Sequence, residues 1–225
     1  MRAFVIGAVA LVCAAGPAMA EPNTLTAAEK AAGWKLLFDG QSTAGWRGYQ
    51  KKTADWKVVD GALAPDPKAS GDLITDEQFA SFELAFDWKV SPKGNSGVMY
   101  HVSEAPERSY YSGPEYQVLD NSRGEPPLQR AGALYDLYAP VVDATKPVGE
   151  FNESRLLVKG SHVEHWLNGQ KVAEYELGSP EFKAKVAKSK FNAWPPFAAS
   201  PKGHIALQNH GDDVWYRNIK VRALK

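Results

Sequence analysis

The sequence predicts an all-β fold in which two sheets pack into a sandwich or jelly roll, with one short helix near residues 180–190. Apolar and polar residues alternate with a period of two through a series of short segments, and turn residues separate these segments. Strands are expected at residues 34–38, 56–59, 62–63, 82–90, 97–102, 115–119, 133–138, 155–159, 162–167, 171–175, 204–209 and 214–221.

The first element is expected to be a short helix. Thr26 is followed three residues later by Glu29, which is the spacing of a capping box, and Gly33 ends the segment. Two hairpins are expected among the strands that follow. Asp60-Gly61 and Asn168-Gly169 each separate two strand-like runs, and these dipeptides favour two-residue hairpin turns.

The most regular alternation covers residues 82–90. Every second side chain from Phe82 to Val90 is apolar, and Glu83, Asp87 and Lys89 lie among the residues between them. A strand with one buried face explains this pattern.

The late helix and three long loops complete the predicted architecture. Pro180 suits a first helical turn, and lysines gather toward the C-terminal end of residues 180–190. The loops at residues 121–130, 138–152 and 191–202 are rich in proline or aromatic residues. Loops at the rim of a sandwich commonly carry binding groups.

The N-terminus predicts export. Arg2, an apolar run over residues 3–15 and Ala18-Met19-Ala20 form a signal-peptide pattern with cleavage after Ala20. We therefore expect a signal peptide at 1–20, a single mature domain at 21–225 and a periplasmic or secreted location. The one cysteine, Cys13, would leave with the signal peptide, so the mature chain would have no thiol and no disulfide.

Composition narrows the class of partner. Lys and Arg together number 26, and so do Asp and Glu, so no net charge draws the chain to nucleic acid. The apolar runs are too short for a membrane span. Seven tryptophans suit stacking on sugar rings, although composition alone favours an aromatic core as their explanation. The expected partner is an oligosaccharide or glycoside, and the sequence indicates no oligomeric state.

The strand at residues 115–119 is the strongest candidate for chemistry. Alternation places Glu115 and Gln117 on one face and directs Tyr116 toward the core. A bulge after Gln117 would turn Asp120 to the same face. The spacing is then similar to the E-x-D-x-x-E strand of concanavalin-like glucanases, but Gln117 replaces the middle carboxylate. A solvated outer strand face is the structural alternative.

Three histidines are candidates for acid–base chemistry. His101 is expected on the same side as Glu115 if the alternation of residues 98–102 is unbroken, and His210 follows the strand at 204–209. His165 lies in the strand at 162–167. Together with carboxylates they could form an acid–base group or bind a divalent metal ion, although each alone is also explained as a hydrogen-bonded structural residue.

The remaining candidates are substrate-binding residues. They share a polar or aromatic side chain at a turn, strand end or loop: Asn95, Gln117, Asp120, Tyr135, Lys190, Trp194, Gln208 and His210.

An ordered series of short motifs resembles the 3-keto-disaccharide hydrolase family over nearly all of the mature chain, from about Gly33 to Leu224. The motifs are Leu37-Phe38-Asp39-Gly40, Gly45-Trp46, Asn95-Ser96-Gly97-Val98, Glu115-Tyr116-Gln117-Val118-Leu119-Asp120-Asn121, Gly132-Ala133-Leu134-Tyr135, Trp166-Leu167-Asn168-Gly169, Gly203-His204-Ile205-Ala206-Leu207-Gln208-Asn209-His210-Gly211 and Arg217-Asn218-Ile219. The resemblance implies a concanavalin-like jelly roll, a bacterial periplasmic or extracellular setting, and cleavage of glycosides already oxidised to a ketone at C3.

A C3 ketone acidifies the C2 proton, which suggests elimination followed by hydration. Such a route needs a base, a group that stabilises the enolate and an acid for the leaving group. We assign catalysis to Glu115, His165 and His101. Two alternatives remain at this point: a retaining β-glucanase that uses Glu115 and Asp120, and a non-catalytic carbohydrate-binding module that stacks sugars on Trp194 and Tyr135.

Overall fold

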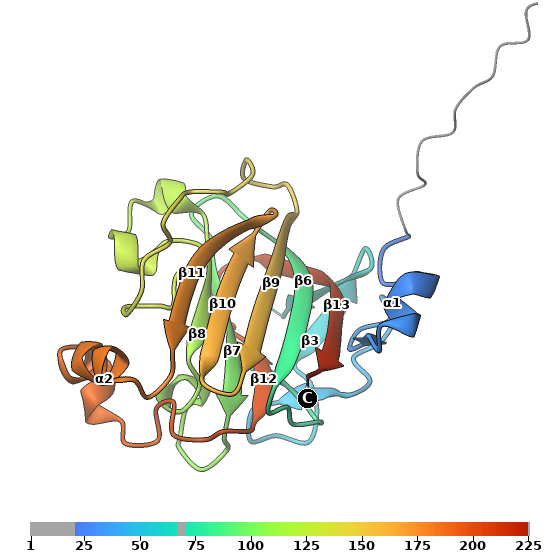
Figure 1. The fold of residues 1–225 in the computed structure, drawn as a ribbon. Coiled ribbons are helices and arrows are strands. Elements are labelled where there is room, and N and C mark those ends of the chain that lie inside the picture. The colour runs from blue at the N-terminus through green and yellow to red at the C-terminus, as the bar shows by residue number, and fades with distance from the viewer. Residues whose placement is uncertain (1–20, 67–70, 225) are drawn as a thin grey trace, which may run out of the picture.

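Two antiparallel β-sheets lie face to face in the computed structural model, which describes residues 21–66 and 71–224 (Figure 1). The predicted signal peptide and Cys13 lie outside the described residues. The first sheet has eight strands in the order β11 (Gln170–Glu176), β10 (His162–Leu167), β9 (Asn152–Lys159), β6 (Phe82–Val90), β13 (Val214–Ala223), β4 (Ala62–Pro65) and β3 (Trp56–Val59), with β1 (Lys35–Leu36) also beside β13.

The second sheet has five strands and lies behind the first in Figure 1. Its order is β2 (Trp46–Gly48), β5 (Leu73–Thr75), β12 (His204–Leu207), β7 (Asn95–Val102) and β8 (Glu115–Leu119). The predicted all-β sandwich is confirmed. None of the helices in the described ranges has the length and apolar character that a membrane span requires.

The helices are short. They are α1 (Ala27–Ala31), α2 (Pro180–Ala187) and the 3₁₀ segments η1 (Ser109–Tyr111), η2 (Asn121–Arg123), η3 (Pro127–Gln129) and η4 (Lys190–Ala193). Both predicted helices are confirmed, and the capping box between Thr26 and Glu29 is complete. The second helix ends three residues earlier than predicted, and a 3₁₀ turn follows it.

The strand alternation holds where it was clearest. The strand β6 has the predicted bounds, and both predicted hairpins form, between β3 and β4 and between β10 and β11. Phe86 of β6 meets Tyr116 of β8 between the sheets, with ring centroids 5.4 Å apart and nearly perpendicular planes. Tyr116 therefore faces the core, as predicted, and Glu115 and Gln117 occupy the outer face of the five-stranded sheet.

The prediction of a strand at residues 133–138 is wrong. Asp136 adopts a left-handed backbone conformation, with φ of +61°, and the backbone N–H of Tyr138 donates to the Leu134 carbonyl at 2.9 Å. The segment therefore turns back on itself after touching the edge of β8. The backbone N–H of Tyr135 donates to the Glu115 carbonyl at 3.1 Å, which holds Tyr135 beside β8.

A β-bulge in β7 corrects the predicted position of His101. His204 pairs with Val102 and Ala206 with Met99, so two steps along β12 match three along β7. The extra residue takes a φ of +52° at His101, and Val102 shares a cluster with Met99 instead of continuing the alternation. His101 accordingly lies beside Phe82, and its Nε2–H donates to the Ala80 carbonyl at 2.7 Å.

Candidate active site

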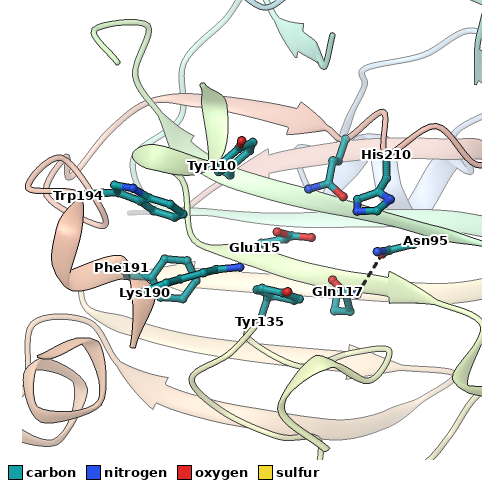
Figure 2. A pocket seen from close by; sticks show the side chains of 10 residues that line it. Asn95, Tyr110, Glu115, Gln117, Tyr135, Lys190, Phe191, Trp194 and His210 are labelled. Carbon is teal, nitrogen blue, oxygen red and sulfur yellow. Dashed lines mark hydrogen bonds between the residues drawn. The ribbon is translucent and has the colours of Figure 1, made fainter. Parts of the chain in front are cut away.

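A cavity of about 280 Å³ opens on the outer face of the five-stranded sheet. It is close to the lower end of the range for small-molecule pockets, roughly 300–1,000 Å³. Glu115 lies at its centre, with Lys190 and Trp194 on one side and Asn95 and His210 on the other (Figure 2).

Eight of the predicted site residues line this pocket. They come from β7, β8, the segment after β12, the turn at residues 134–138, and η4 with the residue that follows it: Asn95, Glu115, Gln117, Tyr135, Lys190, Trp194, Gln208 and His210. The structure does not bring the other three, His101, His165 and Asp120, to the pocket.

His165 is a core residue, which corrects its predicted place in the site. Its side chain is fully buried between Gly132, whose carbonyl accepts from Nδ1–H at 2.9 Å, and Tyr175, whose hydroxyl lies 2.9 Å from Nε2. Burial lowers the pKa of His165 to about 4. The imidazole is therefore neutral and committed to structural hydrogen bonds.

Asp120 is also outside the pocket, because the predicted bulge after Gln117 is absent. The strands β7 and β8 pair without interruption from Met99 opposite Glu115 to Asn95 opposite Leu119. Asp120 instead caps η2 and accepts from the backbone N–H groups of Lys93 at 2.7 Å and Ser122 at 2.9 Å. Although burial opposes it, these hydrogen bonds and that of the Ser122 hydroxyl lower the pKa of Asp120.

Glu115 has the most strongly altered acid–base behaviour in the pocket. Glu115 is only 8% exposed. Burial raises the pKa of its carboxyl to about 8, and the nearby charge of Asp72 acts in the same direction. The ammonium group of Lys190 acts in the opposite direction. A carboxyl with a pKa close to the working pH suits a general acid or base.

Two amide oxygens in the pocket have no hydrogen-bond donor among the described residues. Gln117 Oε1 and Gln208 Oε1 are both buried, and Gln117 uses its amide nitrogen to donate to Asn95 Oδ1 at 3.1 Å. Buried polar atoms are rarely left without a partner in native proteins. Both oxygens are thus available to the hydroxyl groups of a bound ligand.

Lys190 reaches into the pocket from η4 toward Glu115 (Figure 2). Its ammonium lies 4.2 Å from the ring centre of Tyr135 and 3.5 Å from Asp136 Oδ2. The face of Tyr135 is therefore directed at a cation, which leaves less of it for the sugar stacking suggested by the sequence. Lys190 is the lysine or arginine among the residues that line the pocket around Glu115.

An aromatic wall closes the Lys190 side. Trp194 contacts Tyr111 with ring centroids 4.5 Å apart and Tyr110 with centroids 5.7 Å apart, and Phe191 packs on its other side at 5.5 Å. Tyr110 and Phe191 line the pocket and were missed in the sequence. The paired tyrosines in the loop after β7 were the available signal for Tyr110.

His210 stands at the opposite rim. Its side chain is 46% exposed, and Nδ1 lies 3.9 Å from Asp212 Oδ2. It is the histidine that the structure brings to the pocket. The acid–base role that the sequence distributed over three histidines is therefore available, within the pocket, to this one.

A match to a known protein family identifies the family of this chain. The 3-keto-alpha-glucoside-1,2-lyase-like domain family matches residues 33–222, a range that includes every residue lining the pocket. The chain belongs to this family. The resemblance inferred from the short motifs is confirmed.

Relatives of this 3-keto-alpha-glucoside-1,2-lyase-like chain support the assignment. A 3-keto-disaccharide hydrolase from Bacteroides thetaiotaomicron is 34% identical, over 91% of this chain and 83% of that protein. A structure from Parabacteroides distasonis, assigned as a glycosyl hydrolase, is also 34% identical, with a TM-score of 0.85 over 91% of this chain and 100% of its own. A Bacillus subtilis carbohydrate-binding module, 9% identical with a TM-score of 0.50 over 80% and 96% of the chains, shares the fold alone.

Metal ligands are not concentrated in the pocket of this family member. Within residues 21–66 and 71–224, the group of three or more His, Cys, Asp and Glu side chains with ligand atoms within 4.8 Å of one another is His162, Glu164 and Glu174. It lies on β10 and β11, in the other sheet. The divalent metal suggested by the sequence stays a prediction, and the oxygen atoms of Glu115, Gln117 and Gln208 are the pocket groups that would suit a hard cation.

Gly97 keeps space for the Glu115 carboxyl. A Cβ added at Gly97 would lie 2.1 Å from Glu115 Oε1, far inside van der Waals contact. We expect Gly97→Ala to lower kcat by about 10²-fold, because a displacement of about 1 Å in a catalytic group has an effect of that size. Kinetics and the melting temperature of the variant check this together, and an unchanged kcat would show that the position of Glu115 is not critical.

Proposed function

We propose that this chain cleaves the glycosidic bond of glycosides carrying a ketone at C3, with Glu115 as the base that removes the C2 proton. Membership of the 3-keto-alpha-glucoside-1,2-lyase-like family supports the substrate class. The observation that supports the role of Glu115 is its carboxyl, buried at the centre of the pocket with a pKa of about 8. Basicity of that strength suits abstraction of a proton next to a ketone.

The proposed reaction has two stages. Glu115 takes the C2 proton, the resulting enolate at C3 expels the substituent at C1, and the leaving oxygen receives a proton. Water then adds across the C1–C2 double bond, with its oxygen going to C1 and a proton to C2. The net change is hydrolysis, and no oxocarbenium ion is required.

Other pocket residues are suited to stabilise the enolate, protonate the leaving oxygen and bind the sugar hydroxyls. The ammonium of Lys190 is available to stabilise negative charge on the enolate oxygen. His210, next to Asp212, is suited to protonate the leaving oxygen. Gln117 and Gln208 offer unpaired amide oxygens to sugar hydroxyls.

The paired-carboxylate alternative lacks its second carboxylate. A retaining glucanase needs two carboxyl groups about 5–5.5 Å apart that face one site. Asp120 is engaged in the cap of η2 and does not line the pocket. The binding-module alternative rests on fold, which the family shares with sugar-binding proteins of distant sequence.

The proposal is tested by offering a 3-keto-glucoside beside its unoxidised parent, each with and without chelator. We expect cleavage of the keto compound alone. Cleavage of the parent would support the glucanase alternative, and binding of either compound without turnover would support the carbohydrate-binding module. Loss of activity with chelator, restored by added metal, would add a metal ion to the mechanism.

The proposed role of Glu115 predicts how kcat/KM on a 3-keto-glycoside changes with pH. The C2 base must be ionised, and the raised pKa keeps Glu115 protonated below about pH 8. The group that protonates the leaving oxygen must keep its own proton at the same time, so we expect kcat/KM to rise with pH as Glu115 ionises and to fall again at higher pH. The profile is measured with the enzyme-free rate subtracted at each pH, since 3-ketosugars also eliminate in base. A rate that falls as pH rises toward 8 would contradict the assignment of Glu115 as base.

We also propose that the chain works outside the cytoplasm, in the periplasm or secreted. The signal-peptide pattern at residues 1–20 supports this. Cell fractionation, with N-terminal sequencing of the recovered protein, tests it: an N-terminus at Glu21 in the extracytoplasmic fraction is the expected result.

A further inference from the structure

The carboxyl of Asp72 connects three segments that are distant in the sequence. Asp72 directly precedes β5 of the five-stranded sheet. Its Oδ2 accepts a hydrogen bond from the hydroxyl of Ser109 in η1, and its Oδ1 accepts one from the backbone N–H of Asn209 at 2.9 Å. Asn209 belongs to the segment that follows β12. One side chain therefore holds this segment to β5 and to η1.

The segment held by Asp72 carries His210, which immediately follows Asn209. Beyond His210, the chain is held a second time, because Asp212 Oδ2 accepts from the backbone N–H of Asn95 at 3.1 Å. The side chain of His210 is 46% exposed. The position of its imidazole therefore depends strongly on the backbone that carries it, and Asp72 fixes that backbone one residue away.

Asp72 also lies within electrostatic reach of the proposed acid and the proposed base. Burial raises the pKa of Asp72, whereas its two hydrogen bonds and the nearby charges of Arg108 and His210 act to lower it. Burial is the first cause of the raised pKa of Glu115, and Asp72 is the second. Asp72 does not line the pocket around Glu115, so any effect on the reaction passes through other residues.

We propose that Asp72 is the positioning residue for His210, and that its hydrogen bond to the Asn209 backbone holds His210 where it protonates the leaving oxygen. This inference rests on the proposed function, in which the C1–O bond breaks and its electron pair goes to the leaving oxygen. His210 gives a proton to that oxygen and regains one from water.

A positioning role for Asp72 predicts an effect that depends on the leaving group. An alkoxide needs a proton as it leaves, whereas 4-nitrophenolate is a stable anion and leaves without one. Misplacement of His210 should therefore slow cleavage of methyl 3-keto-glucoside much more than cleavage of 4-nitrophenyl 3-keto-glucoside. Damage to the fold, or to Glu115 as base, would slow both.

The test measures kcat/KM on these two substrates in Asp72→Ala, which loses both hydrogen bonds of the carboxyl. We expect a fall of about 10²-fold on the methyl compound, the effect of a misplacement of about 1 Å, and a change within about threefold on the 4-nitrophenyl compound. Asp72→Asn keeps an oxygen that accepts from the Asn209 N–H, so it should restore the ratio between the two substrates.

Three further variants complete the comparison. Asp72→Ser, whose side chain is too short to keep both bonds, should show the same selectivity if Asp72→Ala does not fold. Asp76→Ala is the matched control, since Asp76 directly follows β5 and its side chain is 58% exposed. His210→Asn should itself be selective for the methyl compound, and adding Asp72→Ala to it should cause little further loss, because both substitutions remove the same acid.

The outcomes separate this inference from the proposed function. If His210→Asn is selective but Asp72→Ala lowers activity on both substrates equally or on neither, Asp72 does not position the acid. If His210→Asn is not selective, His210 is not the acid, and the inference is overturned. In both cases cleavage of the two compounds by the unmodified protein still supports the proposed function. If the unmodified protein cleaves neither compound, the proposed function fails and this inference fails with it.

Discussion

Glu115→Gln should lower kcat on a 3-keto-glycoside by roughly 10²- to 10⁴-fold, the range for loss of a general base. The amide has the shape of the carboxyl but cannot accept the C2 proton at any pH. Because Glu115 is buried and its pKa is raised to about 8, removal of its charge should not destabilise the fold. Steady-state kinetics on purified protein, with a melting curve beside it, measures both effects.

Asp120→Asn is the matched control for this substitution. It removes a carboxylate from the same five-stranded sheet region, but one that caps η2 outside the pocket. We expect its kcat to stay within a few-fold of the parent and its melting temperature to fall, since the lowered pKa of Asp120 reflects stabilising hydrogen bonds to the charged form. Equal losses of kcat in the two variants would instead support the paired-carboxylate mechanism.

Lys190→Met should also cause a large loss, about 10²-fold in kcat, because an electrostatic group that stabilises a developing oxyanion has an effect of that order. The substitution has a second consequence. The ammonium lowers the pKa of Glu115, so its removal should shift the inflection of the pH–rate profile to higher pH. A role in packing alone would lower activity without moving the profile.

Lys188→Met provides the control for Lys190→Met. Lys188 is exposed two residues earlier and does not line the pocket. Its replacement should leave both kcat and the pH profile unchanged. If Lys190→Met reduced kcat no more than Lys188→Met does, the enolate would have to be stabilised by another group.

The parts of the fold that sequence could predict are those with a strong local pattern. The strand β6 alternates over nine residues, and the capping box of α1 and the turn at Asp60-Gly61 have specific local chemistry. The strands β2 and β5 were missed because each is only three residues long. All three residues of β5 are buried, so no alternation marks it.

Predictions about the site succeeded and failed for identifiable reasons. Glu115 and Gln117 were found because β8 alternates without a break. His101 was misplaced because a bulge between β7 and β12 depends on pairing with a distant strand, and nothing near His101 in the sequence marks it. The bulge predicted before Asp120 is absent. That prediction applied the spacing of a glucanase strand to β8, but β8 pairs with β7 without interruption.

The approach of Lys190 and Trp194 to Glu115 is a tertiary effect. These residues follow α2, far from β8 in sequence, and Trp194 is held by contacts with Tyr110 and Tyr111 of η1. A local pattern can show that such a loop is aromatic and basic. Only the packing of α2 and η4 beside the five-stranded sheet determines which pocket the loop completes.

The most direct test of the central claim is cleavage of a 3-keto-glycoside in deuterium oxide, with the hydrogen at C2 of the released sugar followed by mass spectrometry and NMR. If Glu115 removes the C2 proton before the glycosidic bond breaks, the released 3-ketosugar should carry deuterium at C2 from the first turnover. The finished product, incubated with enzyme under the same conditions, corrects for later exchange. Because the buried Glu115 could return the same proton to C2, the contradicting result is complete retention of the original hydrogen at C2 together with no primary isotope effect when C2 of the substrate carries deuterium. That result would require direct displacement at C1.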